Sequence, residues 1–173
     1  MNTTVLVLAV MLLIAGAGLG VMVAHRRKSE RLQRRFGPEY ERRVAETGDR
    51  KAAETDLHER ERRRNQLDVR GLRPEERARF QESWTATQSR FVDAPATALK
   101  DADLLVVEIM RVRGYPVEDF DRRAEDISVD HPDVVRHYRD ARAIHDASTD
   151  GSVDTERQRH ALTCYRSLVQ APA

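Results

Sequence analysis

The chain of 173 residues carries 30 Lys and Arg against 29 Asp and Glu, which gives a net charge of +1. Every charged side chain lies after Ala24, so an apolar leader precedes a highly polar remainder. This length allows one membrane span and one modest domain, which excludes a polytopic transporter. The single cysteine, Cys164, excludes a framework of disulfides within the chain.

Residues 5–24 predict a transmembrane helix. They contain no charged residue, and a helix of this length spans roughly 30 Å, the thickness of the hydrocarbon core of a bilayer. The alternative is a cleaved signal peptide, which usually has positive charge before the apolar run and small residues before the cut. No Lys or Arg precedes the run, and Met22 stands where a cut after Ala24 needs a small side chain. We therefore expect an uncleaved anchor.

The charge that follows the apolar run predicts its orientation. Within residues 25–35 a single acid, Glu30, accompanies six basic residues, namely Arg26, Arg27, Lys28, Arg31, Arg34 and Arg35. Because basic residues stay in the cytoplasm, residues 1–4 become a short extracytoplasmic N-terminus and the C-terminal domain is cytoplasmic. The same six side chains are candidates for contact with anionic lipid headgroups, at about 1 kcal/mol per residue near the surface.

Three small residues recur at every fourth position of the predicted span: Gly16, Gly20 and Ala24. Such a stripe lets two membrane helices approach closely and is a candidate face for a homodimer. The alternative is that Gly and Ala are simply common in membrane spans.

Residues 25–72 predict a basic juxtamembrane helical stalk that continues from the span. Between Arg26 and Arg70 there are 15 basic and 10 acidic residues, with few large apolar ones. Gly37-Pro38 and Gly48 should break it into pieces. A helix that is polar all round is stabilised by ion pairs one turn apart or by a partner.

Residues 73–173 predict a small bundle of about five helices, so the fold class is all-α with one N-terminal transmembrane helix. Apolar residues recur with helical spacing, and no strand-like alternation is present. Phe80, Trp84 and Phe91 have the spacing of core residues. The expected helices are Pro74–Val92, Ala96–Arg113, Val117–Ile127, Asp133–Asp146 and Val153–Val169.

Proline, glycine and aspartate suggest where these helices begin and end. A proline is favoured in the first turn of a helix, and a glycine just after the last. We expect first-turn prolines at Pro74, Pro95, Pro116 and Pro132, and helix ends at Gly71 and Gly114. Asp93 and Asp130 each lie two residues before a proline and are candidate N-caps.

The segment from His58 to Asn65, HERERRRN, resembles the basic region of helix-loop-helix DNA-binding proteins. That resemblance covers about eight residues, and Gly71 and Pro74 should stop the helix before the family's amphipathic pair. A DNA reader needs net positive charge on one face, whereas acidic residues are interleaved here. We expect a solvated helix face and no nucleic-acid partner.

Recognisable catalytic signatures are missing from the sequence. It has no phosphate-binding loop, no dinucleotide fingerprint, no nucleophile elbow and no paired cysteines. Asp133 and His137 lie one turn apart, but a metal site needs more ligands, so we expect them to pair with each other. Cys164 has no expected basic neighbour and is predicted as a small buried hydrophobe. We therefore predict no catalytic residue, no metal ligand, no cofactor and no enzyme.

Two helix junctions place polar and aromatic residues at Arg113–Pro116 and Ser128–Pro132. If both lie at one end of the bundle, Tyr115, Asp130 and His131 form a surface patch. The alternative is that these residues serve only as caps and turns.

The segments FGPEY at 36–40, RGYP at 113–116 and SVDHP at 128–132 resemble a group of uncharacterised bacterial proteins. Those proteins have one N-terminal span and a short helical domain, and they are often labelled membrane or secreted proteins. The resemblance implies a bacterial inner-membrane location and carries over no functional residue. The label "secreted" disagrees with the charge argument.

Three functions are open at this stage. The first is a membrane-tethered module that binds a protein partner or a second copy of itself. The second is a module that binds anionic lipid surfaces through electrostatics. The third, more remote, is a small membrane-bound enzyme that uses Asp130, His131 or His137.

Overall fold

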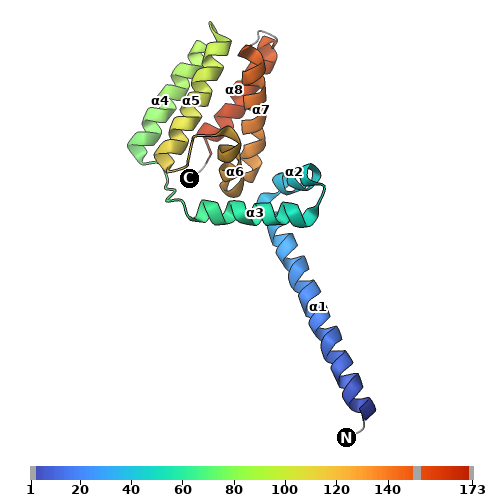
Figure 1. Ribbon diagram of the computed structural model, residues 1–173. Coiled ribbons are helices and arrows are strands. Elements are labelled where there is room, and N and C mark those ends of the chain that lie inside the picture. The colour runs from blue at the N-terminus through green and yellow to red at the C-terminus, as the bar shows by residue number, and fades with distance from the viewer. Residues whose placement is uncertain (1–2, 150–152, 172–173) are drawn as a thin grey trace. The chain divides into compact units, whose positions relative to one another are not determined.

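A computed structural model describes residues 3–149 and 153–171; the side chains of 3–10, 14, 15, 18, 21, 25 and 149 are not described. Within these ranges the regular structure is helical, without a strand, which confirms the all-α class. Figure 1 shows the helices, which are α1 (Thr3–Phe36), α2 (Pro38–Thr47), α3 (Arg50–Asn65), α4 (Pro74–Arg90), α5 (Pro95–Arg113), α6 (Phe120–Asp130), α7 (Pro132–Thr149) and α8 (Thr155–Val169).

The chain divides into two compact units. The N-terminal unit is Met1–Glu54, and the C-terminal unit is Thr55–Ala173. The boundary lies inside α3, so most of this helix belongs with the bundle, ahead of the predicted end of the stalk at residue 72.

In the N-terminal unit, two glycines separate the helices. Gly37 has a φ of 48° between α1 and α2, and Gly48 has a φ of 65° after the last residue of α2. A backbone with positive φ suits glycine because it has no Cβ. The predicted breaks at Gly37-Pro38 and Gly48 are therefore confirmed.

Tyr40 is the centre of the packing in this unit. Its ring is buried, as are Leu32, Phe36 and Ala53. The Tyr40 hydroxyl donates to Glu54 Oε1 at 2.9 Å and accepts from Arg50 Nε at 2.8 Å. These bonds join α2 to the start of α3.

None of the helices, taken over their described residues, is long and apolar enough to cross a membrane. Several side chains of the predicted span at residues 5–24 lie outside the described residues. Residues 1 and 2 of the predicted N-terminal segment also lie outside them. The span therefore stays a prediction.

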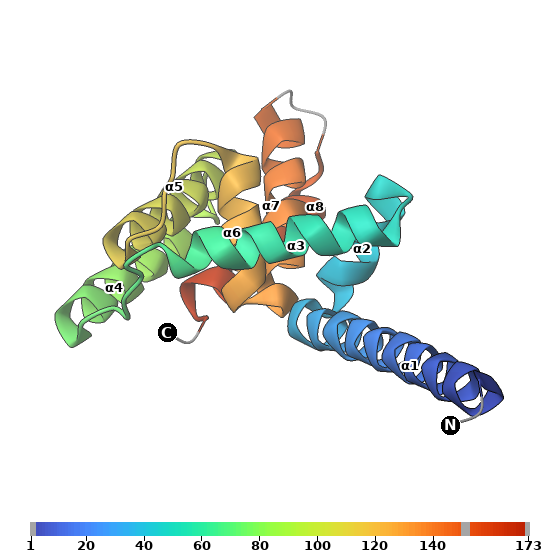
Figure 2. The same cartoon turned by 60° about the horizontal axis from the view of Figure 1, so that its bottom comes forward.

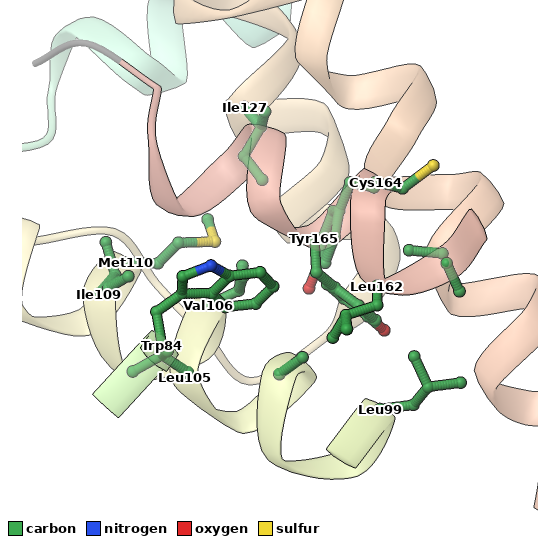
Figure 3. Packing of buried hydrophobic residues seen from close by; sticks show 14 of the residues in the cluster. Trp84, Leu99, Leu105, Val106, Ile109, Met110, Ile127, Leu162, Cys164 and Tyr165 are labelled. Atoms are coloured by element: carbon green, nitrogen blue, oxygen red, sulfur yellow. The ribbon is translucent and has the colours of Figure 1, made fainter. Parts of the chain in front are cut away.

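Helices α4 to α8 form the bundle, which confirms about five helices there. Helix α5 packs against α4, α7 and α8, while α6 packs against α7. Figure 3 shows the indole of Trp84 beside Val106 and Met110 of α5, with Tyr165 of α8 close by. Phe80, Trp84 and Phe91 are buried in this core, as predicted.

The proline signals hold at three of the four positions. Pro74, Pro95 and Pro132 each occupy the first position of a helix. The prediction for Pro116 is wrong, because α6 begins at Phe120 after the N-cap Asp119. The Asp119 carboxylate accepts from the backbone N–H of Arg122 at 2.8 Å, which satisfies one of the free donors in the first turn.

The glycines and aspartates predict helix ends and N-caps less well than the prolines predict helix starts. Gly114 ends α5 with a φ of 97°, as predicted, whereas α3 already ends at Asn65, well before Gly71. The N-cap of α5 is Ala94 and not Asp93. Asp130 is the last residue of α6 and caps no helix start, because its carboxylate is used in tertiary contacts.

Candidate functional site

A cluster of ion pairs joins α3 to α6 within the C-terminal unit, and Figure 2 shows α3 passing across α6. Arg63 Nη2 lies 2.7 Å from Glu125 Oε2, and Arg60 Nη2 lies 3.5 Å from Glu125 Oε1. Arg64 Nε donates to Asp130 Oδ2 at 2.5 Å. Arg60 is only 1% exposed and also donates to Asp56 at 2.8 Å.

The prediction that HERERRRN is a solvated helix face is therefore wrong for Arg60, Arg63 and Arg64, whereas Glu59, Arg62 and Asn65 are exposed. Arg60, Arg63 and Arg64 lie at i, i+3 and i+4, so they share one side of the helix. That side meets carboxylates of α6, and the arginines fasten α3 to the bundle. The partner acids stand more than 60 residues away in the chain, where local sequence reasoning could not connect them.

At the end of this cluster, the two predicted junctions meet. The Tyr115 hydroxyl donates to Asp130 Oδ2, the oxygen that also accepts from Arg64. The guanidinium groups of Arg64 and Arg113 lie 5.8 and 5.6 Å from the centre of the Tyr115 ring, within the range of cation–π attraction. Burial and the Asp130 carboxylate raise the pKa of Tyr115, so its proton stays on the phenol.

His131 follows Asp130 and is the C-cap residue of α6. Its ring is half-buried, and its Nε2 atom is buried without a hydrogen-bond partner. Burial and the positive charge of Arg113 lower the pKa of His131, which keeps the imidazole neutral near pH 7. Of the predicted patch, Tyr115 and Asp130 are joined by a hydrogen bond. The Tyr115 ring is only 5% exposed, so it adds little to the surface.

Tyr115 and His131 both line a small pocket of about 30 Å³. A second pocket of about 220 Å³ adjoins it and shares the lining residues Ile109, Arg113, Leu168 and Ala171. We call the two together the α5–α8 groove. It lies between the C-terminal halves of α5 and α8, and Leu72, Arg77 and Gln81 line its larger pocket.

Asp126 of α6 is a buried acid, and no local sequence signal marks it as buried. It is 1% exposed, and neither carboxylate oxygen has a hydrogen-bond partner. Burial raises the pKa of Asp126, and the nearby charges of Arg122 and Arg63 oppose that rise. A buried carboxyl group without hydrogen bonds favours its neutral form.

The histidines and the cysteine differ from expectation in detail. His137 Nδ1 is buried without a hydrogen-bond partner, so this atom makes no pair with Asp133. Cys164 is buried, as predicted, but His160 Nε2 lies 3.6 Å from its sulfur, so the expectation of no basic neighbour is wrong. Burial raises the pKa of the Cys164 thiol, which keeps it protonated. Over the described ranges, no group of three or more His, Cys, Asp or Glu could hold a metal ion.

The candidate membrane residues lie on α1. Arg26, Arg27, Lys28, Arg31 and Arg34 are exposed, whereas Arg35 is half-buried. Gly16, Gly20 and Ala24 are exposed, and a Cβ added at either glycine would meet no atom within 4 Å. Their assignments to lipid headgroups and to a dimer face stay predictions.

Comparisons with protein-family models, with curated proteins and with solved structures found no match to this chain.

Proposed function

We propose that the protein is a membrane-tethered interaction module, anchored by one span at residues 5–24. The observation that carries this proposal is the exposure of large apolar side chains along α1. Met11, Leu12 and Leu13 are 63%, 74% and 74% exposed, and Leu19 and Met22 are at least half exposed. Consecutive residues of a helix lie on different sides of it, so Met11, Leu12 and Leu13 together expose apolar side chains on several sides of α1. Apolar groups exposed over so much of a helix need an apolar environment such as lipid.

The orientation follows from charge. The exposed basic side chains of α1 come directly after the apolar segment, and the positive-inside rule keeps them in the cytoplasm. We propose a single-pass protein of the bacterial inner membrane with the C-terminal unit in the cytoplasm, in line with the family resemblance of its sequence segments.

The C-terminal unit has the features of a binding module. Its helices share one apolar core, and the ion pairs between α3 and α6 fix the start of the unit against the bundle. The Asp130 carboxylate is engaged by Arg64 and Tyr115, which is a structural use of this acid. We therefore propose binding of a protein partner or a second copy, and no catalytic role for Asp130, His131 or His137.

Chemical crosslinking of the full chain in native membranes tests this function. The expected result is one reproducible homodimer or one reproducible complex. If the stripe on α1 makes the dimer, Gly16→Ile with Gly20→Ile removes the crosslinked dimer, while Ala17→Ile, at an exposed position off the stripe, retains it. Recovery of the chain only as a monomer contradicts the proposal.

A second candidate function is binding to an anionic lipid surface. The exposed basic residues of α1 favour it, because they are not engaged in ion pairs with other residues that the structure describes. No ion pair with a described residue involves Arg26, Arg27, Lys28, Arg31 or Arg34, so these charges are available to headgroups. Hydrogen exchange of the full chain in nanodiscs tests this idea. Amides of residues 26–36 should exchange more slowly in anionic than in zwitterionic lipid, and high salt should abolish the difference. Equal exchange in both lipids contradicts it.

A further inference from the structure

The α5–α8 groove has an apolar floor. Val106, Met110, Ile127 and Val134 line its smaller pocket, and Leu168 lines both pockets. The floor is therefore built from four helices of the bundle, and it is held by the same core that contains Trp84.

The charged lining of the groove is basic. Arg77 and Arg113 line it, and no Asp or Glu does, although the chain has nearly equal numbers of acids and bases. His131 adds no charge near pH 7, since its pKa is lowered. The field inside the groove therefore attracts an anion.

Both arginines lack a carboxylate partner among the residues that the structure describes. Arg113 Nε donates to the backbone oxygen of Arg70 at 3.4 Å and its guanidinium group lies over the Tyr115 ring, but it makes no ion pair with a described residue. Nearby arginines behave differently: Arg70 and Arg73 both pair with Glu76, and Arg79 pairs with Glu108. A guanidinium group has five donors in a planar fork that matches a carboxylate.

The size of the groove limits its occupant. The pockets measure about 30 and 220 Å³. Sites for drug-sized molecules typically measure about 300–1,000 Å³, so the groove is too small for a bulky ligand or a whole acyl chain. It is suited to the end of one apolar side chain with a carboxylate beside it.

We infer that the α5–α8 groove docks a segment of a partner protein in which an apolar side chain neighbours an acidic one. The end of the apolar side chain enters the smaller pocket, beside Val106 and Leu168, and the carboxylate meets Arg77 and Arg113. This inference rests on the proposed function and names the surface and the partner chemistry that the function needs.

Short fluorescent peptides with a Leu or Phe flanked by Asp and Glu provide the test, with the detergent-solubilised full chain and anisotropy as the readout. Matched peptides carry Asn and Gln in place of the acids, or Ser in place of the apolar residue. We expect binding of the acidic, apolar peptides and at least a tenfold loss with either matched peptide.

Variants of the chain locate the binding surface. Arg77→Gln, at an exposed position, should weaken binding of the acidic peptide at least tenfold without unfolding the bundle, and Arg113→Gln should do the same. Arg111→Gln, an exposed arginine of α5 that does not line the groove, should leave binding unchanged.

Three results overturn the inference: no binding of any acidic peptide, equal binding by Arg77→Gln, or displacement of the peptide by anionic vesicles but not by excess unlabelled peptide. If the crosslinked complex in membranes persists while these tests fail, the docking inference falls and the proposed function stands. If the chain is also monomeric in membranes, both fall.

Discussion

Arg63 and Glu125 form an ion pair of 2.7 Å that joins α3 to α6. The same carboxylate lies 3.5 Å from Arg60, whose side chain is almost completely buried. Removing one partner of a buried pair leaves the other charge without full compensation, which costs more than the pair itself contributes.

We predict that Glu125→Gln destabilises the C-terminal unit by about 2 kcal/mol, because the buried guanidinium group of Arg60 then loses the charge of one carboxylate, while its ion pair with Asp56 remains. Urea unfolding followed by the fluorescence of the single tryptophan, Trp84, measures the change. Glu108→Gln removes an exposed pair with Arg79 and should cost less than about 0.5 kcal/mol. Equal effects of the two substitutions would show that α3 is not fastened through Glu125.

This pair also shows where sequence reasoning reached its limit. Helices α4, α5, α7 and α8 follow from apolar periodicity and prolines, which are local signals. The role of the arginine run in α3 depends on acids that the fold brings from a distant helix. An arginine that is solvated and one that is buried look the same in the sequence.

The wrong prediction of a helix start at Pro116 also comes from a local signal that fits more than one structure. A proline is compatible with the first turn of a helix and equally with an extended loop. Here Tyr115 binds Asp130, which holds the chain in a loop until Asp119 caps α6. Tyr115 and Asp130 could be named as candidates from their places at junctions, whereas nothing in the sequence marks Asp126 as buried.

Gly114 should tolerate no side chain. Its φ is 97°, and a Cβ there would lie 2.5 Å from the backbone oxygen of Asp68, which cannot easily move. Gly114→Ala should destabilise the C-terminal unit by about 3 kcal/mol or more, as measured by urea unfolding. Gly71→Ala, at an exposed glycine without positive φ, should change stability by less than about 1 kcal/mol. A mild effect at Gly114 would mean that the loop before α4 does not pack against the end of α5.

Asp126 should make the C-terminal unit less stable as pH rises. Its pKa is raised in the folded state, so the folded chain binds the proton more tightly than the unfolded chain. This stabilisation is complete at pH values below the pKa of Asp126 in the unfolded chain. It is lost as pH rises through the raised pKa of Asp126 in the folded chain. Asp126→Asn should remove this part of the pH dependence in urea titrations. Asp121→Asn, at an exposed acid of the same helix, serves as the control. An unchanged profile for Asp126→Asn would contradict a buried, proton-binding carboxyl group.

Glu76 should make the C-terminal unit more stable as pH rises, which is opposite to the effect of Asp126. Hydrogen bonds from Arg70 and Arg73 lower the pKa of Glu76, so its contribution to stability is present above the unfolded pKa and is lost as pH falls through the lowered one. Glu76→Gln should therefore be less stable than the unmodified chain at neutral pH, with a difference that shrinks in acid. Thermal unfolding at several pH values measures this trend. Glu75→Gln, on the exposed side of α4, should change little at any pH, and a constant deficit for Glu76→Gln would exclude the charge as its cause.

The central claim is that residues 5–24 anchor the chain with the C-terminal unit in the cytoplasm. Lys100→Cys places a thiol at an exposed position of that unit, while the native Cys164 is buried. The most direct measurement is the labelling of this thiol by a membrane-impermeant maleimide, in cells whose membrane fraction is also extracted with alkaline carbonate. We predict a chain that resists extraction and is labelled only after the cells are broken. Labelling in intact cells, or release of the chain by carbonate, would contradict the claim.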